Sequence, residues 1–209
     1  ETKDGFQESF QVNYLSAFLL TNLLLPHLQA GGTPATPARV VTLSSLLHFY
    51  GQMTWEEHES GRVLSEADYA AGGDRQAYSN SKLMNVAFAN ELQQRVDKHE
   101  AFANKITSTS LQPGVIFTGL HREDAAKPIK YTIYRTVVSL IGKDVLHGAQ
   151  TSIYAAVSSE LNGKGGLFLS DCAAVAPHKE AEDPEIGARL WSLSLSLLQR
   201  KGFLSDGTL

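Results

Sequence analysis

Three short runs rich in apolar and β-branched residues alternate with longer segments of helical periodicity along this chain. The runs cover residues 39–43, 105–111 and 167–169, and each has the length of a β-strand. In the longer segments, apolar residues recur at three- and four-residue steps, as they do in helices that pack against a core. Alternation of strands and helices is typical of a parallel sheet with helices on its faces. The sequence therefore predicts an α/β fold.

The helical segments have recognisable ends. An aspartate stands before each of two helices, where its carboxylate can accept bonds from the first backbone N–H groups. Pro26 and Gly31 predict the end of the first helix, and Ile153 and Val157 belong to the predicted buried face of the third. The expected helices are 6–29, 78–98, 144–161 capped by Asp144, and 184–198 capped by Asp183.

Composition limits the classes of function. The chain has 209 residues, with 18 Lys and Arg against 22 Asp and Glu, and a formal net charge of -4. This length fits one domain, which we take as residues 1–209, and the lack of a basic cluster argues against binding nucleic acid. The single Cys172 excludes an internal disulfide. The histidines lack the spacing of metal ligands, so no metal site is expected.

No run reaches the ~18–20 apolar residues of a membrane span, and the first residues lack the pattern of a signal peptide. We expect an intracellular protein, cytoplasmic or membrane-associated, and not a secreted one. The long polar stretch 46–76 is a candidate lid or pocket wall, since loops of this length are usually functional. For the apolar and basic segment 117–141 core packing is the default, with a substrate wall or peripheral membrane contact as alternatives.

Tyr78 and Lys82 are four residues apart in a predicted helix, so their side chains lie one above the other on the same face. A phenol has a pKa of about 10 and is a poor base at neutral pH. An ammonium at ~4 Å favours the phenolate by up to ~4 kcal/mol at an effective dielectric of about 20, which brings the pKa toward the range useful for proton transfer. The spacing alone is weak evidence, because Tyr131 and Arg135 share it and are interpreted as an exposed helix face.

Other polar and turn-forming residues accompany this pair. Ser45 follows the first strand, where a hydroxyl can bond a substrate oxygen, and Pro113 and Gly114 follow the second, where the backbone can approach a flat ligand. Asn13 lies among apolar neighbours in the first helix and needs a partner or a water. Each has a structural alternative: a turn residue for Ser45, a buried amide for Asn13 and a plain turn for Pro113-Gly114. Residues 171–172 are interpreted as turn or packing residues, not as a catalytic pair.

In their order and context, these residues resemble the short-chain dehydrogenase/reductase superfamily, and the sequence is closest to its retinol-dehydrogenase-like branch. The resemblance extends over residues 4–198. It implies a Rossmann-type, doubly wound parallel sheet, of which this chain would hold the last three strands with their flanking helices. The matching motifs are Asn13-Tyr14-Leu15-Ser16, Leu43-Ser44-Ser45, Tyr78…Lys82, Pro113-Gly114…Thr118, Gly148-Ala149-Gln150-Thr151-Ser152 and Phe168-Leu169-Ser170-Asp171-Cys172.

The resemblance implies a role for each matching residue. Tyr78 would be the general acid/base that exchanges a proton with the substrate oxygen, while Lys82 would lower its pKa and bind the nicotinamide ribose. Ser45 would orient the carbonyl or alcohol, and Asn13 would hold a water in a proton relay that reaches Lys82. The residues implied to line the nicotinamide, besides Tyr78 and Lys82, are Pro113, Gly114, Val115 and Thr118.

The implied activity is hydride transfer between NAD(P)(H) and a small apolar alcohol or carbonyl compound, such as a retinoid, another lipid or a xenobiotic. The resemblance favours NADP over NAD. The family's glycine-rich phosphate loop, G-x-x-x-G-x-G, and its N-N-A-G strand do not occur in the sequence, so we expect activity to need that half of the fold. A catalytically inactive relative that acts as a binding or scaffolding protein is the alternative, and assembly into a homo-oligomer stays open.

Overall fold

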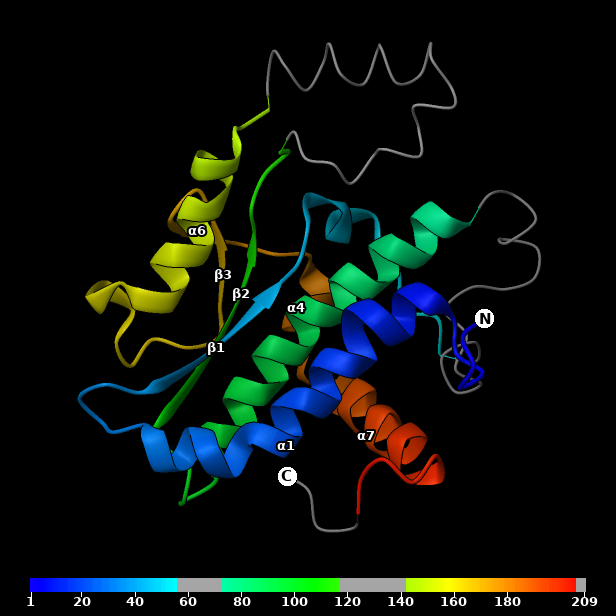
Figure 1. Cartoon of the computed structure of the whole chain (residues 1–209), viewed down its shortest axis with the longest axis horizontal. Helices are drawn as coiled ribbons and strands as arrows, with labels where there is room; N and C mark the ends of the chain where they lie inside the picture. The colour runs from blue at the N-terminus through cyan, green and yellow to red at the C-terminus, as the bar shows by residue number, and fades with distance from the viewer. Residues whose placement is uncertain (56–72, 117–141, 206–209) are drawn as a thin grey trace.

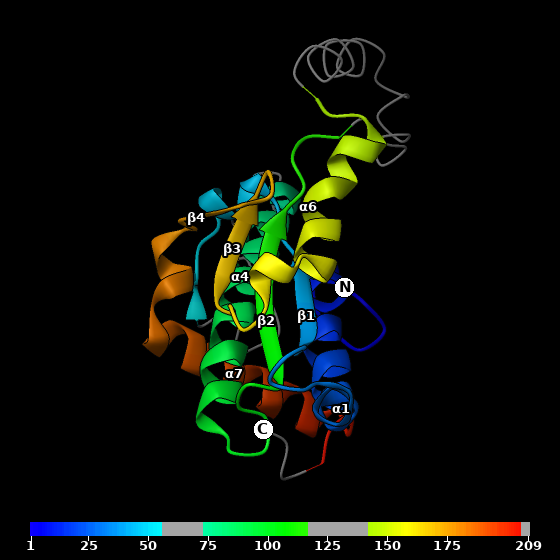
Figure 2. The ribbon, with the colours of Figure 1, turned by 90° about the vertical axis from the view of Figure 1, so that its left-hand side faces the viewer.

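A four-stranded sheet forms the centre of the protein, with its strands in the order β1-β2-β3-β4 (Figure 2). The computed structural model describes residues 1–55, 73–116 and 142–205. The first three strands are parallel and β4 runs antiparallel to β3, so the predicted α/β fold, part of a Rossmann-type arrangement, is confirmed. The strands are β1 (Ala38–Leu43), β2 (Ile106–Gln112), β3 (Leu167–Ser170) and β4 (Ala173–Val175).

Helices cover both faces of the sheet (Figure 1). Three helices, α1, α4 and α7, enclose the larger apolar core on one face, while α6 covers a smaller cluster on the other. Among the described helices, none combines the length and the apolar character needed to cross a membrane. The helices are α1 (Ser16–Gly31), α4 (Asp74–Lys98), α6 (Val145–Val157) and α7 (Pro184–Arg200), and the short helical turns are η1 (Phe10–Leu15), η2 (Leu46–Tyr50), η4 (Ser159–Leu161) and η5 (Lys179–Glu182).

The strand register brings the carboxyl ends of the three parallel strands to one edge of the sheet. Leu43 at the end of β1 pairs with Leu111 in β2, and Gln112 at the end of β2 pairs with Ser170 at the end of β3. The segments that follow these strands therefore start side by side. This is the edge at which parallel α/β sheets bind their ligands.

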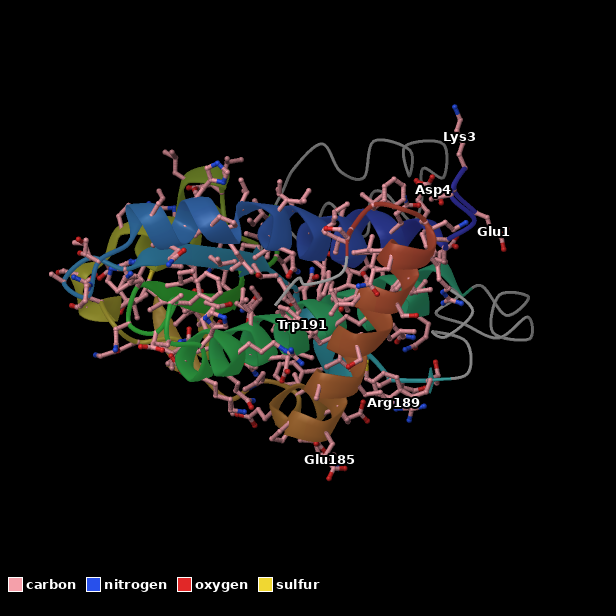
Figure 3. The ribbon with its side chains drawn as sticks, turned by 90° about the horizontal axis from the view of Figure 1, so that it is seen from below. Glu1, Lys3, Asp4, Glu185, Arg189 and Trp191 are labelled. Atoms are coloured by element: carbon pink, nitrogen blue, oxygen red, sulfur yellow. The ribbon has the colours of Figure 1, made fainter. Side chains whose placement is uncertain are left out.

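An aromatic cluster holds the three helices of the larger core together. Trp191 points from α7 toward α4, whereas Glu185 and Arg189 lie toward the outer side of α7 (Figure 3). The Trp191 ring centre lies 4.8 Å from that of Phe18 in α1 and 5.9 Å from that of Phe88 in α4. Such aromatic pairs stabilise a core beyond the area that they bury. The direction of α4, which carries the candidate site, is thereby set from two sides.

The first helix ends at Gly31, two residues beyond the expected end at residue 29, and it continues through Pro26, so the prediction that Pro26 helps to end it is wrong. Proline removes one backbone N–H group from the helix. The neighbouring Leu25 is buried and Leu28 packs against the same core, so tertiary contacts hold the helix on both sides of the proline.

The buried face of α6 also differs from the prediction. Ile153 and Val157 are exposed, whereas Gly148, Thr151 and Ala155 are the buried residues of this helix. The small residues allow α6 to approach the sheet closely. A Cβ atom added at Gly148 would lie 2.3 Å from the Cδ1 atom of Ile116.

Strand β4 was not expected from the sequence. Asp171 and Cys172 connect it to β3 as a two-residue turn with positive φ angles of 51° and 59°. Two positive φ values are the geometry of a type I′ hairpin turn, which fits the right-handed twist of the strands. The interpretation of these two residues as a turn is therefore confirmed, although the hairpin itself was missed.

Two adjacent glycines offer a test of the packing at the end of α1. A Cβ atom added at Gly32 would lie 2.0 Å from the Lys105 carbonyl oxygen and 2.8 Å from the Ala38 nitrogen, both backbone atoms. We expect Gly32→Ala to lower the free energy of unfolding by ~1–3 kcal/mol, because overpacking forces the backbone to move. Thermal or urea unfolding of the purified chain measures this change.

Gly31→Ala is the matched control, since nothing lies within 4 Å of a Cβ atom added at Gly31. Its expected effect ranges from none to a gain of up to ~1 kcal/mol, because alanine is the better helix former. Equal losses of stability in the two variants would contradict the close approach at Gly32.

Candidate active site

Helix α4 carries Tyr78 and Lys82 in its first turns, on one face. The helix begins at Asp74, four residues before the predicted start, so both side chains are fixed by regular helical backbone. The Nζ atom of Lys82 lies 5.5 Å from the centre of the Tyr78 ring. Both side chains are half-buried, which keeps them within reach of a ligand. The structure therefore brings this predicted pair together.

Lys82 also contacts the end of β1. Its Nζ atom donates a hydrogen bond to the Leu43 carbonyl oxygen at 3.2 Å. Burial lowers the pKa of Lys82 from its ordinary value. An amine that is partly removed from water interacts more strongly with a charge that forms beside it, because the local dielectric is lower.

Ser45 begins the turn that follows β1. Its Oγ atom accepts a hydrogen bond of 3.2 Å from the Leu47 backbone N–H and so caps η2. This bond uses a lone pair of the oxygen and leaves the hydroxyl hydrogen for another acceptor. The preceding Ser44 donates from its Oγ atom to the Lys82 carbonyl oxygen at 2.7 Å. Ser45 is thus held next to the part of α4 that carries Lys82.

The segment after Ser45 packs closely on α4. A Cβ atom added at Gly51 would lie 2.7 Å from the Cβ atom of Leu83 and 2.8 Å from the Ser79 carbonyl oxygen. The backbone N–H of Gln52 donates to the Oδ1 atom of Asn80 at 2.9 Å. Part of the stretch predicted as a lid or pocket wall is therefore a short helical turn fixed to α4, while residues 56–72 lie outside the described part.

Asn13 lies in η1, a π-helical turn just before α1. Its Nδ2 atom donates to the Ser81 Oγ atom at 3.1 Å, and Ser81 in turn donates to the Tyr78 carbonyl oxygen at 2.7 Å. π-Helical turns inside longer helices are frequent at functional sites. The side-chain amide of Asn13 thus bonds to Ser81, which directly precedes Lys82 and lies beside the Tyr78 and Lys82 pair.

Pro113, Gly114 and Val115 form a fixed turn at the end of β2. Gly114 has a φ angle of 91°, and its backbone N–H donates to the Gln112 Oε1 atom at 2.7 Å. The amide of Gln112 donates in turn to the Ser170 Oγ atom at 2.6 Å, which ties the turn to β3. Among the described residues, these bonds and the 2.8 Å bond from the Lys143 backbone N–H to the Val115 carbonyl oxygen join the turn to β3 and to the segment before α6, and no hydrogen bond joins it to Tyr78. Thr118 lies outside the described residues.

Three residues that the sequence analysis did not select help to build the site. Ser44 and Asn80 hold the segment after β1 on α4, as described above. Asn85 donates from its Nδ2 atom to the Leu43 carbonyl oxygen at 2.9 Å. Asn85 follows Tyr78 and Lys82 at steps of four and three residues, which places it on the same face of α4, and this spacing is a signal that could have revealed it.

The histidines do not form a metal site in the described ranges, where no group of three His, Cys, Asp or Glu side chains lies close enough to hold an ion. His48 is fully buried, as expected for a packing residue. His147 is exposed at the surface and bonds to Asp144 at 2.8 Å. His58 lies outside the described part.

Comparison with known proteins shows related enzymes over nearly the whole chain, although no family model matches it. Mouse polyprenol dehydrogenase is 39% identical over 207 residues, which cover 99% of this chain and 58% of that protein. Mouse retinol dehydrogenase 14 is 34% identical over 194 residues, covering 93% of this chain and 53% of that protein. WW domain-containing oxidoreductase from Gallus gallus is 33% identical over 207 residues, covering 96% of this chain and 45% of that protein.

A solved structure is also similar to this chain over nearly its whole length. The crystal structure of an uncharacterized protein from Mycobacterium paratuberculosis superimposes with a TM-score of 0.64 at 29% identity, over 95% of this chain and 61% of that one. The chain spans about half the length of the curated relatives that it matches. The sequence motifs, the parallel sheet and these relatives agree, and the chain belongs to the short-chain dehydrogenase/reductase superfamily.

Proposed function

We propose that this chain supplies the catalytic and substrate-binding half of an oxidoreductase domain that transfers hydride between NAD(P)(H) and an apolar alcohol or carbonyl compound. The observation that carries the proposal is the position of Tyr78 over Lys82 on α4, beside the end of β1 and the Ser45 turn. The names of the relatives support an oxidoreductase, and two of them name an alcohol as substrate.

In this proposal Tyr78 exchanges a proton with the substrate oxygen. The Lys82 Nζ atom lies 5.5 Å from the centre of the Tyr78 ring, so in this proposal its positive charge interacts with the charge that develops on Tyr78 as the proton moves. The Ser45 hydroxyl, whose hydrogen is not used in capping η2, donates to the same substrate oxygen. Asn13, through its contact with Ser81, holds a water that passes protons toward Lys82.

The cofactor, NAD or NADP, would supply or accept the hydride. The turn after β2 suits a flat ring because its backbone is fixed by Gln112 and its Gly114 adopts a positive φ angle of 91°. In the proposal, Pro113, Gly114, Val115 and Thr118 line the nicotinamide, while Tyr78 and Lys82 bind its ribose. This arrangement leaves the choice between the two cofactors to residues that bind the adenosine half.

The substrate is proposed to be apolar on two grounds. Polyprenol and retinol, which name two relatives, are both long apolar alcohols. Apolar side chains are also exposed on the segments that follow β1 and β2, namely Leu46, Phe49, Tyr50 and Val115. Residues 117–141, proposed as a further substrate wall, lie outside the described part.

Tyr78→Phe tests the proposed proton transfer. The measurement uses the extended chain, in which the present sequence is joined to the part of mouse polyprenol dehydrogenase that the match leaves uncovered. With retinal and NADPH or NADH, we expect kcat to fall on the order of 100- to 10,000-fold, the usual contribution of a positioned general acid or base. Loss of absorbance of the reduced cofactor reports the rate.

Tyr154→Phe is the matched control, because its hydroxyl bonds to Glu160 at 2.9 Å near the end of α6, away from α4. This variant should keep the parent rate. An inactive parent would favour the binding or scaffolding alternative, and a Tyr78→Phe variant as fast as the parent would contradict the role of Tyr78.

Lys82→Met tests the electrostatic state of the site through stability. Folding lowers the pKa of Lys82 below its ordinary value of 10.5, so the charged form is less stable in the folded chain. This destabilisation is present at neutral pH and fades as the pH rises through the lowered pKa. We therefore expect Lys82→Met to unfold at a higher temperature than the parent at neutral pH, with a smaller difference at alkaline pH.

Lys98→Met, the same change at an exposed position at the end of α4, is the control and should not raise the unfolding temperature. Thermal unfolding followed by circular dichroism at both pH values measures the differences. A Lys82→Met variant less stable than the parent at neutral pH would show that the burial of this amine is not costly.

A further inference from the structure

His48 is a fully buried imidazole for which the proposed chemistry has no role. It has no exposed surface, and it lies in η2, three residues after Ser45. Its ring centre is 4.0 Å from that of Phe49 and 4.7 Å from that of Phe168 in β3. Two aromatic contacts restrict the orientation of the imidazole, so its nitrogens point in fixed directions.

Both ring nitrogens of His48 have backbone partners. The Nδ1 atom lies 2.7 Å from the Ser45 carbonyl oxygen, and the Nε2 atom accepts from the His178 backbone N–H at 3.1 Å. A carbonyl oxygen can only accept and a backbone N–H can only donate. The contacts therefore select the neutral ring with its hydrogen on Nδ1, and burial, which lowers the pKa of His48, favours the same form.

The two bonds connect segments that are far apart in the sequence. Ser45 lies at the end of β1, and its carbonyl oxygen accepts from both the backbone and the ring of His48. His178 caps η5, where its Nδ1 atom accepts from the Glu180 backbone N–H at 3.3 Å. The Glu180 carboxylate accepts in turn from the Met53 backbone N–H at 3.3 Å. The imidazole thus joins the turn after β1 to the segment that leads into α7.

We infer that His48 is a positioning residue for Ser45, which it holds in place by bridging the Ser45 carbonyl and the His178 N–H. This inference, here called the His48 bridge, rests on the proposed function, since Ser45 is the proposed donor to the substrate oxygen. The Ser45 side chain leaves the same backbone that the imidazole fixes. A displacement of ~1 Å of a catalytic group can reduce the rate by about 100-fold, so the bridge is expected to act on kcat.

Three variants separate the parts of the bridge. His48→Phe keeps an aromatic ring between Phe49 and Phe168 but removes both hydrogen bonds. His48→Asn is long enough to place an amide N–H near the position of Nδ1 and so restores the bond to Ser45. His48→Gln is long enough to place an amide oxygen near the position of Nε2 and so restores the bond from His178.

His99→Phe is the matched control. His99 also packs on a phenylalanine, with its ring centre 4.5 Å from that of Phe102, and its Nδ1 atom accepts from the Ala101 backbone N–H. It caps the far end of α4, ~30 Å from Tyr78 at the helical rise of ~1.5 Å per residue. This variant should leave the rate of the extended chain unchanged.

The decisive measurement is a double-mutant cycle in the extended chain, with retinal and reduced cofactor as the probe. We expect His48→Phe to lower kcat on the order of 10- to 100-fold while KM for the cofactor changes little. His48→Asn should recover most of this loss, and His48→Gln should recover less. In the Ser45→Ala background, His48→Phe should have almost no further effect, because the group that it positions is gone.

Equal losses in the two backgrounds would overturn the inference, since they would show that His48 acts on the whole fold and not through Ser45. NMR on the present chain gives an independent readout that needs no activity. A ring hydrogen on Nδ1, with a shifted Ser45 carbonyl-carbon resonance in His48→Phe, supports the bridge, whereas a hydrogen on Nε2 overturns it. An inactive extended chain contradicts the proposed function, and the NMR result then decides the bridge alone.

Discussion

The carbonyl oxygen of Leu43, the last residue of β1, holds the candidate site together. It accepts hydrogen bonds from Lys82 and Asn85, which lie one turn apart on α4. Ser44 donates to the backbone carbonyl of Lys82 in the same helix. The end of β1 therefore both accepts hydrogen bonds from α4 and donates one to it. The turn that begins at Ser45, directly after β1, is therefore held next to the part of α4 that carries Tyr78.

Local patterns were enough to predict most of the elements and the central pair of the site. Strand lengths, helical periodicity and the Asp144 and Asp183 caps depend on neighbours in the sequence, and the two aspartates do cap α6 and α7. The spacing of Tyr78 and Lys82 is equally local, since a helix places residues four apart on one face.

What the sequence did not reveal depends on contacts between distant segments. The buried face of α6 is chosen by the close approach of Gly148 to Ile116, and the path of α1 through Pro26 by packing of its flanking leucines. Strand β2 carries four Ser and Thr residues in ITSTSLQ, yet all of its residues are buried, because α4 covers one face of the strand and α6 the other. The partners of His48 lie in residues 45, 168 and 178, and no spacing rule connects them.

Two ionisable side chains at this edge of the sheet, the buried His48 and the half-buried Lys82, have opposite requirements. The neutral form of His48 satisfies both of its hydrogen bonds, whereas the proposed function requires Lys82 to carry a positive charge that its burial opposes. A chain selected only for stability would replace the amine by an apolar group and keep the imidazole. Proteins retain destabilising groups where activity needs them, so a partly buried cation beside Tyr78 supports the proposed function.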